Sequence, residues 1–237
     1  MIYEIADLRI EIRSRHPFTA WLCRDYLSAD QTSPAQIAAE VTEQEMIAEK
    51  AVAPELDDGS LESNCLYRKI CVELPRFHRI LLHAAVVGYE GKGYAFLGKS
   101  GAGKSTHAGL WLRYGKGVKI VNGDKPILKV ENGEITAYGT PWQGKEMLGE
   151  KGRTPLAALC FIEQSKQNRI RKLSNSETAK RLILQTIYPK EEFAAKKTLE
   201  LLNAIIEYTP AYLLECDVSE NAFQTSFEGL CGKEERV

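Results

Sequence analysis

The stretch GKSGAGKSTH, residues 98–107, contains the full pattern G-x-x-x-x-G-K-[ST], in which a glycine-rich loop leads into a lysine and a hydroxyl residue. The apolar letters YAFL precede this stretch, and a helical run from Lys104 to Tyr114 follows it and stops at Gly115. A strand, a glycine-rich turn and a helix in this order predict a phosphate-binding loop. The alternative is a glycine-rich turn without a chemical role.

Each residue type in this loop has its own task in phosphate binding. The glycines carry no Cβ atom, so backbone N–H groups can approach the phosphates, and the positive end of the helix dipole adds to their effect. Lys104 is expected to neutralise the β- and γ-phosphates, and the Ser105 hydroxyl to bind Mg²⁺. We therefore expect ATP, or another nucleotide phosphoryl donor, and Mg²⁺ as cofactors. The residues assigned to the nucleotide are Gly98, Lys99, Ser100, Gly101, Ala102, Gly103, Lys104, Ser105 and Thr106.

The strand that leads into the loop is predicted to be the second arm of a hairpin. In residues 79–98, RILLHAAVVGYEGKGYAFLG, two apolar runs are joined by YEGKGY, whose glycines suit a tight antiparallel turn. The commonest phosphate-loop enzymes instead enter the loop from a parallel βαβ unit. The antiparallel hairpin before the loop therefore disfavours the common fold in which a parallel βαβ unit leads into the loop.

An acidic residue closes the next predicted strand. GVKIVNGD, residues 117–124, ends at Asp124. Because Mg²⁺ prefers oxygen ligands and usually keeps several waters, Asp124 is the candidate metal ligand beside Ser105. Aspartate is also common in turns, so a turn without a metal is the alternative.

The rest of the chain predicts a mixed α/β fold, a sheet with antiparallel hairpins covered by helices. We expect residues 1–75 to form strands and helices that pack on a phosphate-loop core of residues 76–237, with the whole chain as one compact unit. The alternation near the N-terminus predicts an antiparallel pair from YEIADLRIEIRS and FTAWLCRDYL, followed by a short helix at residues 34–41. LAALCFIEQ and RIRKL are predicted to pair around SKQN, ENGE is predicted to be a hairpin turn, and AYLLECDV a strand. Further helices are predicted at residues 61–74, 176–188, 191–208 and 220–230.

Composition excludes several classes of function. The 237 residues hold 31 Lys and Arg against 32 Asp and Glu, so no basic footprint for nucleic acid is expected. No window approaches about 18 uninterrupted apolar residues, and the charged N-terminus is unlike a signal peptide, so we expect a cytoplasmic protein that does not enter a membrane. The six cysteines show no C-x-x-C spacing and are expected to be reduced and mostly buried.

The central third of the chain resembles the HPr kinase/phosphorylase family, whose catalytic core is similar to that of phosphoenolpyruvate carboxykinases. The segments that carry the resemblance are LLHAAVV, GKSGAGKST and IVNGDKPIL, which lie within residues 80–130. AYGTPWQGKE, LYRKI and LILQTIYP extend the resemblance over nearly the whole chain, toward a further group of HPr-kinase-like proteins. The resemblance implies a phosphoenolpyruvate carboxykinase-like phosphate-loop core and an ATP-dependent kinase.

The resemblance also assigns roles to individual residues. His83 matches a histidine that lies near the reacting phosphate in the family, although a lone histidine in an apolar strand is equally well explained as a core residue. The family usually has two adjacent aspartates after the next strand, whereas this chain has Gly123 and Asp124. Asp124 then serves as both base and metal ligand, or Glu146 supplies the base, or catalysis is weak. His107 has no matched role and is expected to be structural.

A loop after the next predicted strand offers groups for a second substrate. Within GTPWQGKE, residues 139–146, Trp142 provides a stacking surface and Lys145 a positive charge for a phosphate or acid group. The alternative is a surface loop anchored by a buried tryptophan.

Two functions from different classes remain open from the sequence. The first is an ATP- and Mg²⁺-dependent phosphotransferase that acts on a hydroxyl of a small molecule or on a protein serine. HPr is a weak candidate for the acceptor, because the chain lacks the separate N-terminal domain and the HPr-contacting segment of the family. The second is a nucleotide-binding regulatory protein with weak or no catalysis. The oligomeric state stays open, a homo-oligomer included.

Overall fold

The computed structural model describes residues 1–232, which form a three-stranded sheet and a nine-stranded sheet with helices around them. The strands are β1 (Ile2–Ile5), β2 (Leu8–Arg13), β3 (Ile37–Glu40), β4 (Arg79–Leu81), β5 (Ala84–Tyr89), β6 (Lys92–Leu97), β7 (Lys119–Asn122), β8 (Ile127–Glu131), β9 (Glu134–Tyr138), β10 (Arg153–Gln164), β11 (Arg169–Lys172) and β12 (Ala211–Cys216). The α-helices are α1 (Pro17–Leu22), α2 (Glu43–Val52), α3 (Asp58–Glu73), α4 (Lys104–Tyr114), α5 (Asn175–Leu182), α6 (Glu192–Tyr208) and α7 (Glu220–Cys231).

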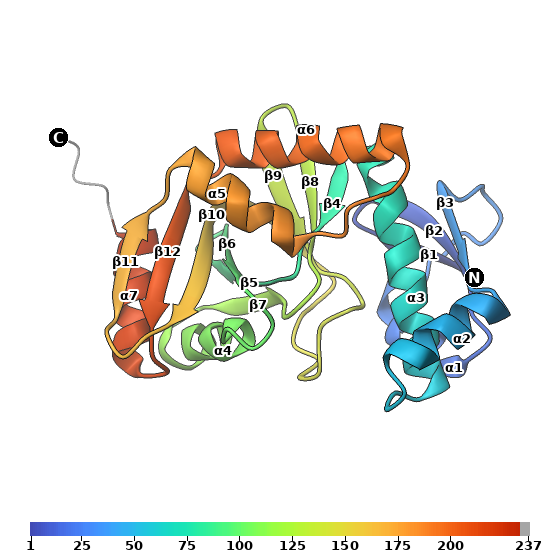
Figure 1. Cartoon of the computed structure of the whole chain (residues 1–237), viewed down its shortest axis with the longest axis horizontal. Coiled ribbons are helices and arrows are strands. Elements are labelled where there is room, and N and C mark those ends of the chain that lie inside the picture. The colour runs from blue at the N-terminus through green and yellow to red at the C-terminus, as the bar shows by residue number, and fades with distance from the viewer. Residues whose placement is uncertain (233–237) are drawn as a thin grey trace.

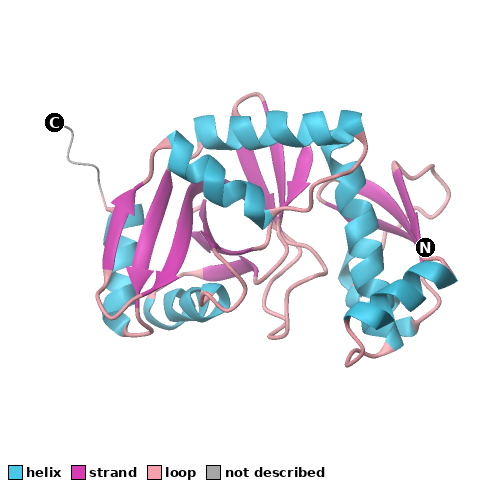
Figure 2. Cartoon of the chain, viewed as in Figure 1, coloured by secondary structure: helices cyan, strands magenta, loops and turns pink. Residues whose placement is uncertain are grey.

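The two sheets lie toward opposite ends of the long axis of the molecule (Figure 1). The small sheet with α1, α2 and α3 lies at one end, and β11, β12 and α7 lie at the other. Helices α5 and α6 cover one face of the large sheet, and α4 and α7 lie against the other face (Figure 2). The fold is therefore mixed α/β with helices on both faces of a large sheet.

The large sheet is mixed and curled, and β10 connects its two parts. The strand order is β4-β8-β9-β10-β6-β5-β7, with β12 on β10 and β11 on β12. The first residues of β10 pair with β9 in antiparallel fashion, and its later residues pair in parallel with β6 on one side and β12 on the other. The parallel strands β6, β10 and β12 therefore end at the same edge of the sheet. The predicted phosphate-binding loop, residues 98–103, follows β6 at that edge.

Strand β6 holds the phosphate-binding loop against a core that is packed on both faces. Tyr94 and Phe96 contact the aromatic cluster around Trp111 of α4, whereas Ala95 and Leu97 belong to the core beneath α6. An apolar strand buried on both sides is typical of the centre of a layered α/β protein. The start of the loop is thereby fixed in position.

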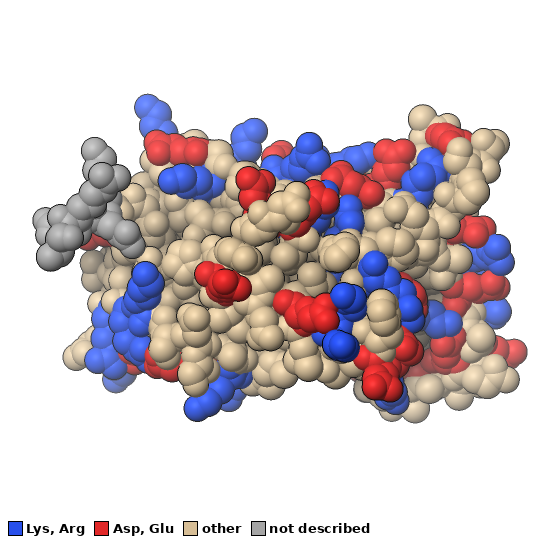
Figure 3. Space-filling model, turned by 90° about the horizontal axis from the view of Figure 1, so that it is seen from above, with Lys and Arg blue, Asp and Glu red and all other residues tan. Residues whose placement is uncertain are grey.

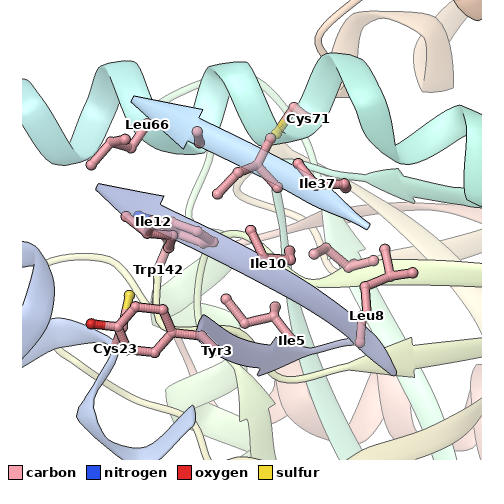
Figure 4. Close-up of a cluster of buried hydrophobic side chains, with 14 of the residues drawn as sticks. Tyr3, Ile5, Leu8, Ile10, Ile12, Cys23, Ile37, Leu66, Cys71 and Trp142 are labelled. Atoms are coloured by element: carbon pink, nitrogen blue, oxygen red, sulfur yellow. The ribbon is translucent and has the colours of Figure 1, made fainter. Parts of the chain in front are cut away.

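The N-terminal sheet has a core of its own that also takes in residues from the larger part of the chain. Its apolar side chains come from β1, β2, β3, α1 and α3, and Figure 4 shows Trp142 below Ile12 in this cluster. Leu81, Ile127 and Tyr138 of the large sheet belong to the same cluster. The buried Arg79 donates a hydrogen bond to the carbonyl oxygen of Ala6 at 2.7 Å.

Turn chemistry explains the hairpins that were predicted. Glu90 and Gly91, between β5 and β6, have φ of 46° and 74°, and Asn132 and Gly133, between β8 and β9, have φ of 52° and 79°. Positive φ at both central residues is the requirement of a type I′ turn, whose twist matches paired antiparallel strands. The predictions of both hairpins are confirmed.

Three local predictions were wrong, two of them because pairing with a strand from elsewhere in the chain outweighs the local pattern. The predicted helix at residues 34–41 is β3, which pairs in parallel with β2, and Ile37 and Ala39 are buried against that strand. The segment FTAWL was predicted to be a strand but forms α1, and the antiparallel pair lies within residues 2–13. Strands β10 and β11 do not pair directly, because β12 lies between them.

Basic and acidic side chains alternate over the surface seen in Figure 3. Within residues 1–232, no helix is long and apolar enough to cross a membrane. Among these residues the six cysteines are free, and all except Cys231 are buried.

Candidate functional site

The phosphate-binding loop connects β6 to the first turn of α4. Gly103 caps α4 in the left-handed conformation with φ of 102°, where a side chain would strain the backbone. A Cβ at Gly98 would lie 3.0 Å from the carbonyl oxygen of Ile162 on β10. Both positions therefore need glycine, one for its conformation and one for its close packing.

Lys104 lies at the base of the loop and is 6% exposed. Its Nζ donates to the carbonyl oxygens of Gly98 and Lys99, at 3.0 and 3.2 Å. Burial lowers the pKa of Lys104, and the negative charge of Asp124 partly opposes that shift. A buried ammonium in the first turn of a helix, beside a glycine-rich loop, is suited to binding phosphate.

The turn after β7 presents Asp124 toward the loop and is held by Asn122. The buried Asn122 accepts hydrogen bonds at Oδ1 from the backbone N–H groups of Asp124 and Lys125, at 2.9 and 2.7 Å. Its Nδ2 donates to Thr140. The NGD sequence is typical of such a turn, because an Asn side chain readily accepts a hydrogen bond from the backbone two residues ahead. The turn therefore orients Asp124 through its own backbone.

Asp124, which follows β7, meets His83, which directly precedes the antiparallel neighbour strand β5. His83 Nε2 lies 3.1 Å from Asp124 Oδ1, and Lys125 Nζ lies 2.8 Å from Asp124 Oδ2. The backbone N–H of His83 donates to the carbonyl of Gln185 at 2.7 Å. Burial raises the pKa of Asp124, but the hydrogen bond from His83 and the charge of Lys125 outweigh it and hold that pKa below 3.8. Asp124 is therefore ionised at neutral pH.

The backbone of a neighbouring loop occupies the space beside Gly123. A Cβ at Gly123 would lie 2.8 Å from the carbonyl oxygen of Gln143 and 3.0 Å from that of Leu148. The same loop approaches Asp124, because a Cβ at Gly144 would lie 3.1 Å from the Cβ of Asp124. This packing leaves no room for a second aspartate side chain at position 123 beside Asp124.

We expect the Gly123→Ala variant to be less stable than the wild type by about 1–3 kcal/mol, because its methyl group would overlap backbone oxygens. The matched control is Gly109→Ala in α4, where nothing lies within 4 Å of the added Cβ. Removing a glycine from a helix interior is expected to stabilise by about 1 kcal/mol. Urea unfolding of the three proteins measures both effects. If Gly123→Ala and the wild type are equally stable, the backbone of residues 143–148 moves away from the added methyl group at little cost, and the prediction is wrong.

In the loop at residues 142–147, the predicted substrate residue Trp142 is buried, whereas Lys145 and Glu146 are on the surface. Trp142 is 7% exposed, its Nε1 donates to Ser63 Oγ at 3.2 Å, and its ring lies 5.9 Å from that of Tyr67. This burial agrees with the anchoring role considered for the tryptophan. Lys145 and Glu146 are exposed. The indole thus holds the loop, and the charged side chains lie at its outer edge.

One cleft brings the predicted chemical groups together. Its volume is about 800 Å³. His83, Lys104, Ser105, Asp124, Trp142, Lys145 and Glu146 all line it, as do Ser100, Gly101, Gly103 and Thr106 of the phosphate-binding loop. The opposite wall was missed from the sequence and comes from α1, α3 and the loop before α3: Phe18, Leu22, Leu56, Ser60, Ser63, Asn64 and Tyr67.

A second cavity, of about 630 Å³, lies on the other side of the phosphate-binding loop. It shares Gly101, Gly103 and Thr106 with the first cleft and also includes Ala102. Residues 164–166 after β10 and 216–218 after β12 form its far wall. Lys99 faces a third cavity, of about 370 Å³, which also contains Gln185.

His107 belongs to a buried hydrogen-bond cluster between α4 and α7. Ser226 Oγ donates to the Phe223 carbonyl and accepts from Trp111 Nε1, so its single proton is already used. His107 Nε2, at 2.9 Å from Ser226 Oγ, is therefore the donor to it. His107 Nδ1 is a buried acceptor without a partner among the described residues. Burial lowers the pKa of His107 to about 4.

This pKa predicts that His107 makes the protein less stable in acid. Because the folded pKa of about 4 lies below the ordinary 6.5, the unfolded chain binds more protons between these values. The stability that the neutral imidazole contributes is complete above pH 6.5 and is lost as the pH falls toward 4. Between pH 7 and 4.5 the wild type should lose about 2 kcal/mol more than His107→Gln, which does not titrate. Urea unfolding at both pH values tests this, and equal losses would contradict it.

The donor set in the cleft suits Mg²⁺ better than a metal that needs a full protein cage. Within residues 1–232, no group of three or more His, Cys, Asp and Glu side chains is arranged to hold a metal. Ser105 and Asp124 provide a hydroxyl and a carboxylate in the same cleft. Mg²⁺ commonly takes only one or two protein oxygens and completes its shell with phosphate oxygens and water.

Comparisons with known proteins identify a family model that matches the chain and a distantly similar solved structure. No curated protein matches the sequence. The Hpr(Ser) kinase/phosphatase from Coxiella burnetii is a similar solved structure, with 12% sequence identity, a TM-score of 0.36, and coverage of 64% of this chain and 93% of that chain. A family model described as SynChlorMet cassette protein ScmC matches residues 60–230. Because this match spans well over half of the sequence, from α3 into α7, the chain belongs to the ScmC family of SynChlorMet cassette proteins.

Proposed function

We propose that this protein is an ATP- and Mg²⁺-dependent phosphotransferase with an HPr-kinase-like and phosphoenolpyruvate carboxykinase-like phosphate-loop core, which transfers the γ-phosphoryl group to a hydroxyl. The observation that carries the proposal is the His83–Asp124 pair, at 3.1 Å, in the same cleft as Lys104 and Ser105. A phosphate-binding loop alone is compatible with simple nucleotide binding. An ionised carboxylate in that cleft adds a group that can accept a proton.

In the proposed reaction the acceptor hydroxyl oxygen forms a bond to the γ-phosphorus while the bond from that phosphorus to the bridging oxygen of ADP breaks. The hydroxyl proton passes to the carboxylate of Asp124, which His83 holds in position. Lys104 and the loop N–H groups oppose the negative charge of the β- and γ-phosphates. Because phosphoryl transfer passes through a loose transition state, a base of low pKa is adequate.

Ser105 and Asp124 are the residues that would hold Mg²⁺ in this proposal. An ion held there would supply positive charge that offsets part of the negative charge of the phosphates. The nucleoside would extend past Thr106 into the second cavity, where the loops after β10 and β12 end. This direction suits the phosphate-binding loop, because the N-terminus of α4 faces the phosphates and the parallel strands end at the same edge.

The second candidate function is a nucleotide-binding protein that does not transfer phosphate. Two observations favour it: Gly123 leaves a single aspartate, and both oxygens of Asp124 already have partners in His83 and Lys125. In this case nucleotide binding would change stability or assembly without turnover.

The two functions are separated by adding Mg²⁺ and radiolabelled ATP to the purified protein with a panel of hydroxyl compounds and serine peptides. The phosphotransferase proposal predicts nucleotide binding together with labelled product that depends on the acceptor. Tight binding of nucleotide with no labelled product across the panel would favour the second function. Absence of nucleotide binding would remove both.

A further inference from the structure

We propose that the phosphoryl acceptor is a small hydroxyl compound with an apolar body, and that the N-terminal helices α1 and α3 recognise that body. This inference rests on the proposed phosphotransferase function and specifies the substrate class of the same cleft. Four features of the cleft support it: its place beside the phosphates, its uneven distribution of charge, the unpaired groups on α3, and its size.

Three cavities border the phosphate-binding loop, and His83 and Asp124 line the first of them but neither of the other two. The second cavity runs from Thr106 to the ends of β10 and β12, and suits the nucleoside. The first cleft contains His83 and Asp124. A compound whose hydroxyl reaches Asp124 must therefore lie in the first cleft and extend away from the loop.

The charged residues that line this cleft come from the phosphate-binding loop, from the turn after β7 and from Lys145 and Glu146, whereas α1, α3 and the loop before α3 contribute only uncharged residues. Lys104, Asp124 and Lys125 lie at the phosphate end, where Lys125 and Asp124 form an ion pair at 2.8 Å. The opposite wall, from α1, α3 and the loop before α3, contains the apolar side chains of Phe18, Leu22 and Leu56 together with the ring of Tyr67. An apolar wall gains free energy by covering an apolar part of a ligand, roughly 25 cal/mol per Å² buried.

Helix α3 presents a neutral polar row along the cleft. Ser60, Asn64 and Tyr67 are spaced i, i+4 and i+7, so they share one face of the helix, and all three line the cleft. Ser60 bonds to Asp57, whereas the Asn64 amide and the Tyr67 hydroxyl form no hydrogen bond with other residues in the range 1–232. Both groups are therefore available to an uncharged polar group on the ligand.

The size and walls of the cleft favour a small molecule over the serine of a folded protein. A volume of about 800 Å³ is within the usual range for small-molecule sites, roughly 300–1,000 Å³. Walls from α1, from α3 and from residues 142–147 face the space beside Asp124. A serine on a protein surface would have to bring its neighbouring residues between these walls.

The test uses 2-phenylethanol as the apolar hydroxyl probe, glycerol as a polar hydroxyl compound and a serine-containing heptapeptide. Binding to the nucleotide-free protein is followed by ligand-observed NMR, and transfer from radiolabelled MgATP is measured separately. The variant is Leu56→Asn, which makes the far wall polar and keeps the same number of side-chain heavy atoms and the branch at Cγ. The matched control is Val52→Asn on α2, because Val52 is 82% exposed and lies outside the cleft lining.

The wild type is expected to bind 2-phenylethanol and to phosphorylate it in preference to glycerol and to the peptide. Leu56→Asn should weaken both binding and kcat/KM for this probe by about tenfold, with nucleotide affinity unchanged. Val52→Asn should match the wild type in every measurement. Leu56→Met, which keeps the wall apolar, should remain within about twofold of the wild type, and this separates polarity from a folding defect.

The outcomes distinguish failure of this inference from failure of the proposed function. Transfer to the peptide or glycerol with no binding of 2-phenylethanol would overturn the apolar acceptor and leave the phosphotransferase intact. If the protein binds 2-phenylethanol, and Leu56→Asn weakens that binding, the apolar site is supported. If the same protein binds no nucleotide, the phosphotransferase proposal fails. Equal binding by the wild type and Leu56→Asn would overturn the inference.

Discussion

Asp124→Asn is expected to lower the rate of phosphoryl transfer by about 10²–10⁴-fold, the usual contribution of a positioned acid–base group. Asparagine is nearly isosteric and can still accept the hydrogen bond from His83 at its Oδ1, although it loses the ion pair with Lys125. The turn after β7 should keep its shape, because Asn122 bonds the backbone of residues 124 and 125. It cannot accept a proton, and it is a poorer ligand for Mg²⁺. Steady-state transfer from MgATP to an accepted hydroxyl compound measures the loss, and nucleotide binding without Mg²⁺ measures what is retained.

Two comparison variants make this result specific. Asp25→Asn is the matched control, because the Asp25 side chain is 69% exposed and outside the cleft lining. Glu146→Gln tests the other carboxylate considered for the base, which is exposed at the edge of the cleft. A larger loss from Glu146→Gln than from Asp124→Asn would assign the base to Glu146.

The pH dependence follows from the direction of the Asp124 shift. Because its pKa lies below 3.8, the carboxylate is ionised throughout the neutral range, and stability from its pairing with His83 and Lys125 is lost only as the pH falls through that lowered value. Titration of Asp124 therefore predicts no fall in kcat between pH 5 and 8. A fall in this range that disappears in Asp124→Asn would contradict the lowered pKa.

Lys104→Met is expected to weaken nucleotide binding and to lower transfer by about 10²–10³-fold, comparable to removing one charge-stabilising group from an active site. Methionine fills the buried path of the lysine stem but supplies neither the charge nor the donors to Gly98 and Lys99. Calorimetric titration with MgATP measures affinity, and thermal unfolding without nucleotide shows whether the loop still folds.

Lys116→Met, in the exposed turn after α4, is the matched control for removal of a positive charge. It should bind nucleotide as the wild type does. If both variants keep wild-type affinity, the glycine-rich turn does not bind phosphate through Lys104, and the proposed function would fail with it.

Local chemistry explains why the central third of the chain could be predicted from the sequence. Positive φ at Gly91 and Gly133 makes tight hairpins, and Gly103 starts α4 directly after an apolar strand. These features depend on residues that are close together in the chain, so the local sequence is enough to predict them. The NGD sequence also predicted the turn at Asn122, but it did not predict the hydrogen bonds that the Asn122 side chain accepts.

The wrong predictions concern segments whose partners are far away in the chain. Residues 34–41 have an alanine-rich composition that favours a helix, but pairing with β2 makes them a strand. Similarly, β12 enters between β10 and β11 from about forty residues further on, counted from the end of β11. Short apolar segments have weak intrinsic preferences, and burial against a partner decides between helix and strand.

The sequence by itself determined the glycine-rich loop between β6 and α4, its antiparallel lead-in and the acidic turn that follows, because glycine, asparagine and apolar alternation act through neighbouring residues. Only the tertiary structure decided what surrounds them. The backbone of residues 143–148 leaves no room for a side chain at Gly123, and α3 turns Asn64 and Tyr67 into the cleft. Those placements depend on packing between distant segments, which no local pattern of letters encodes.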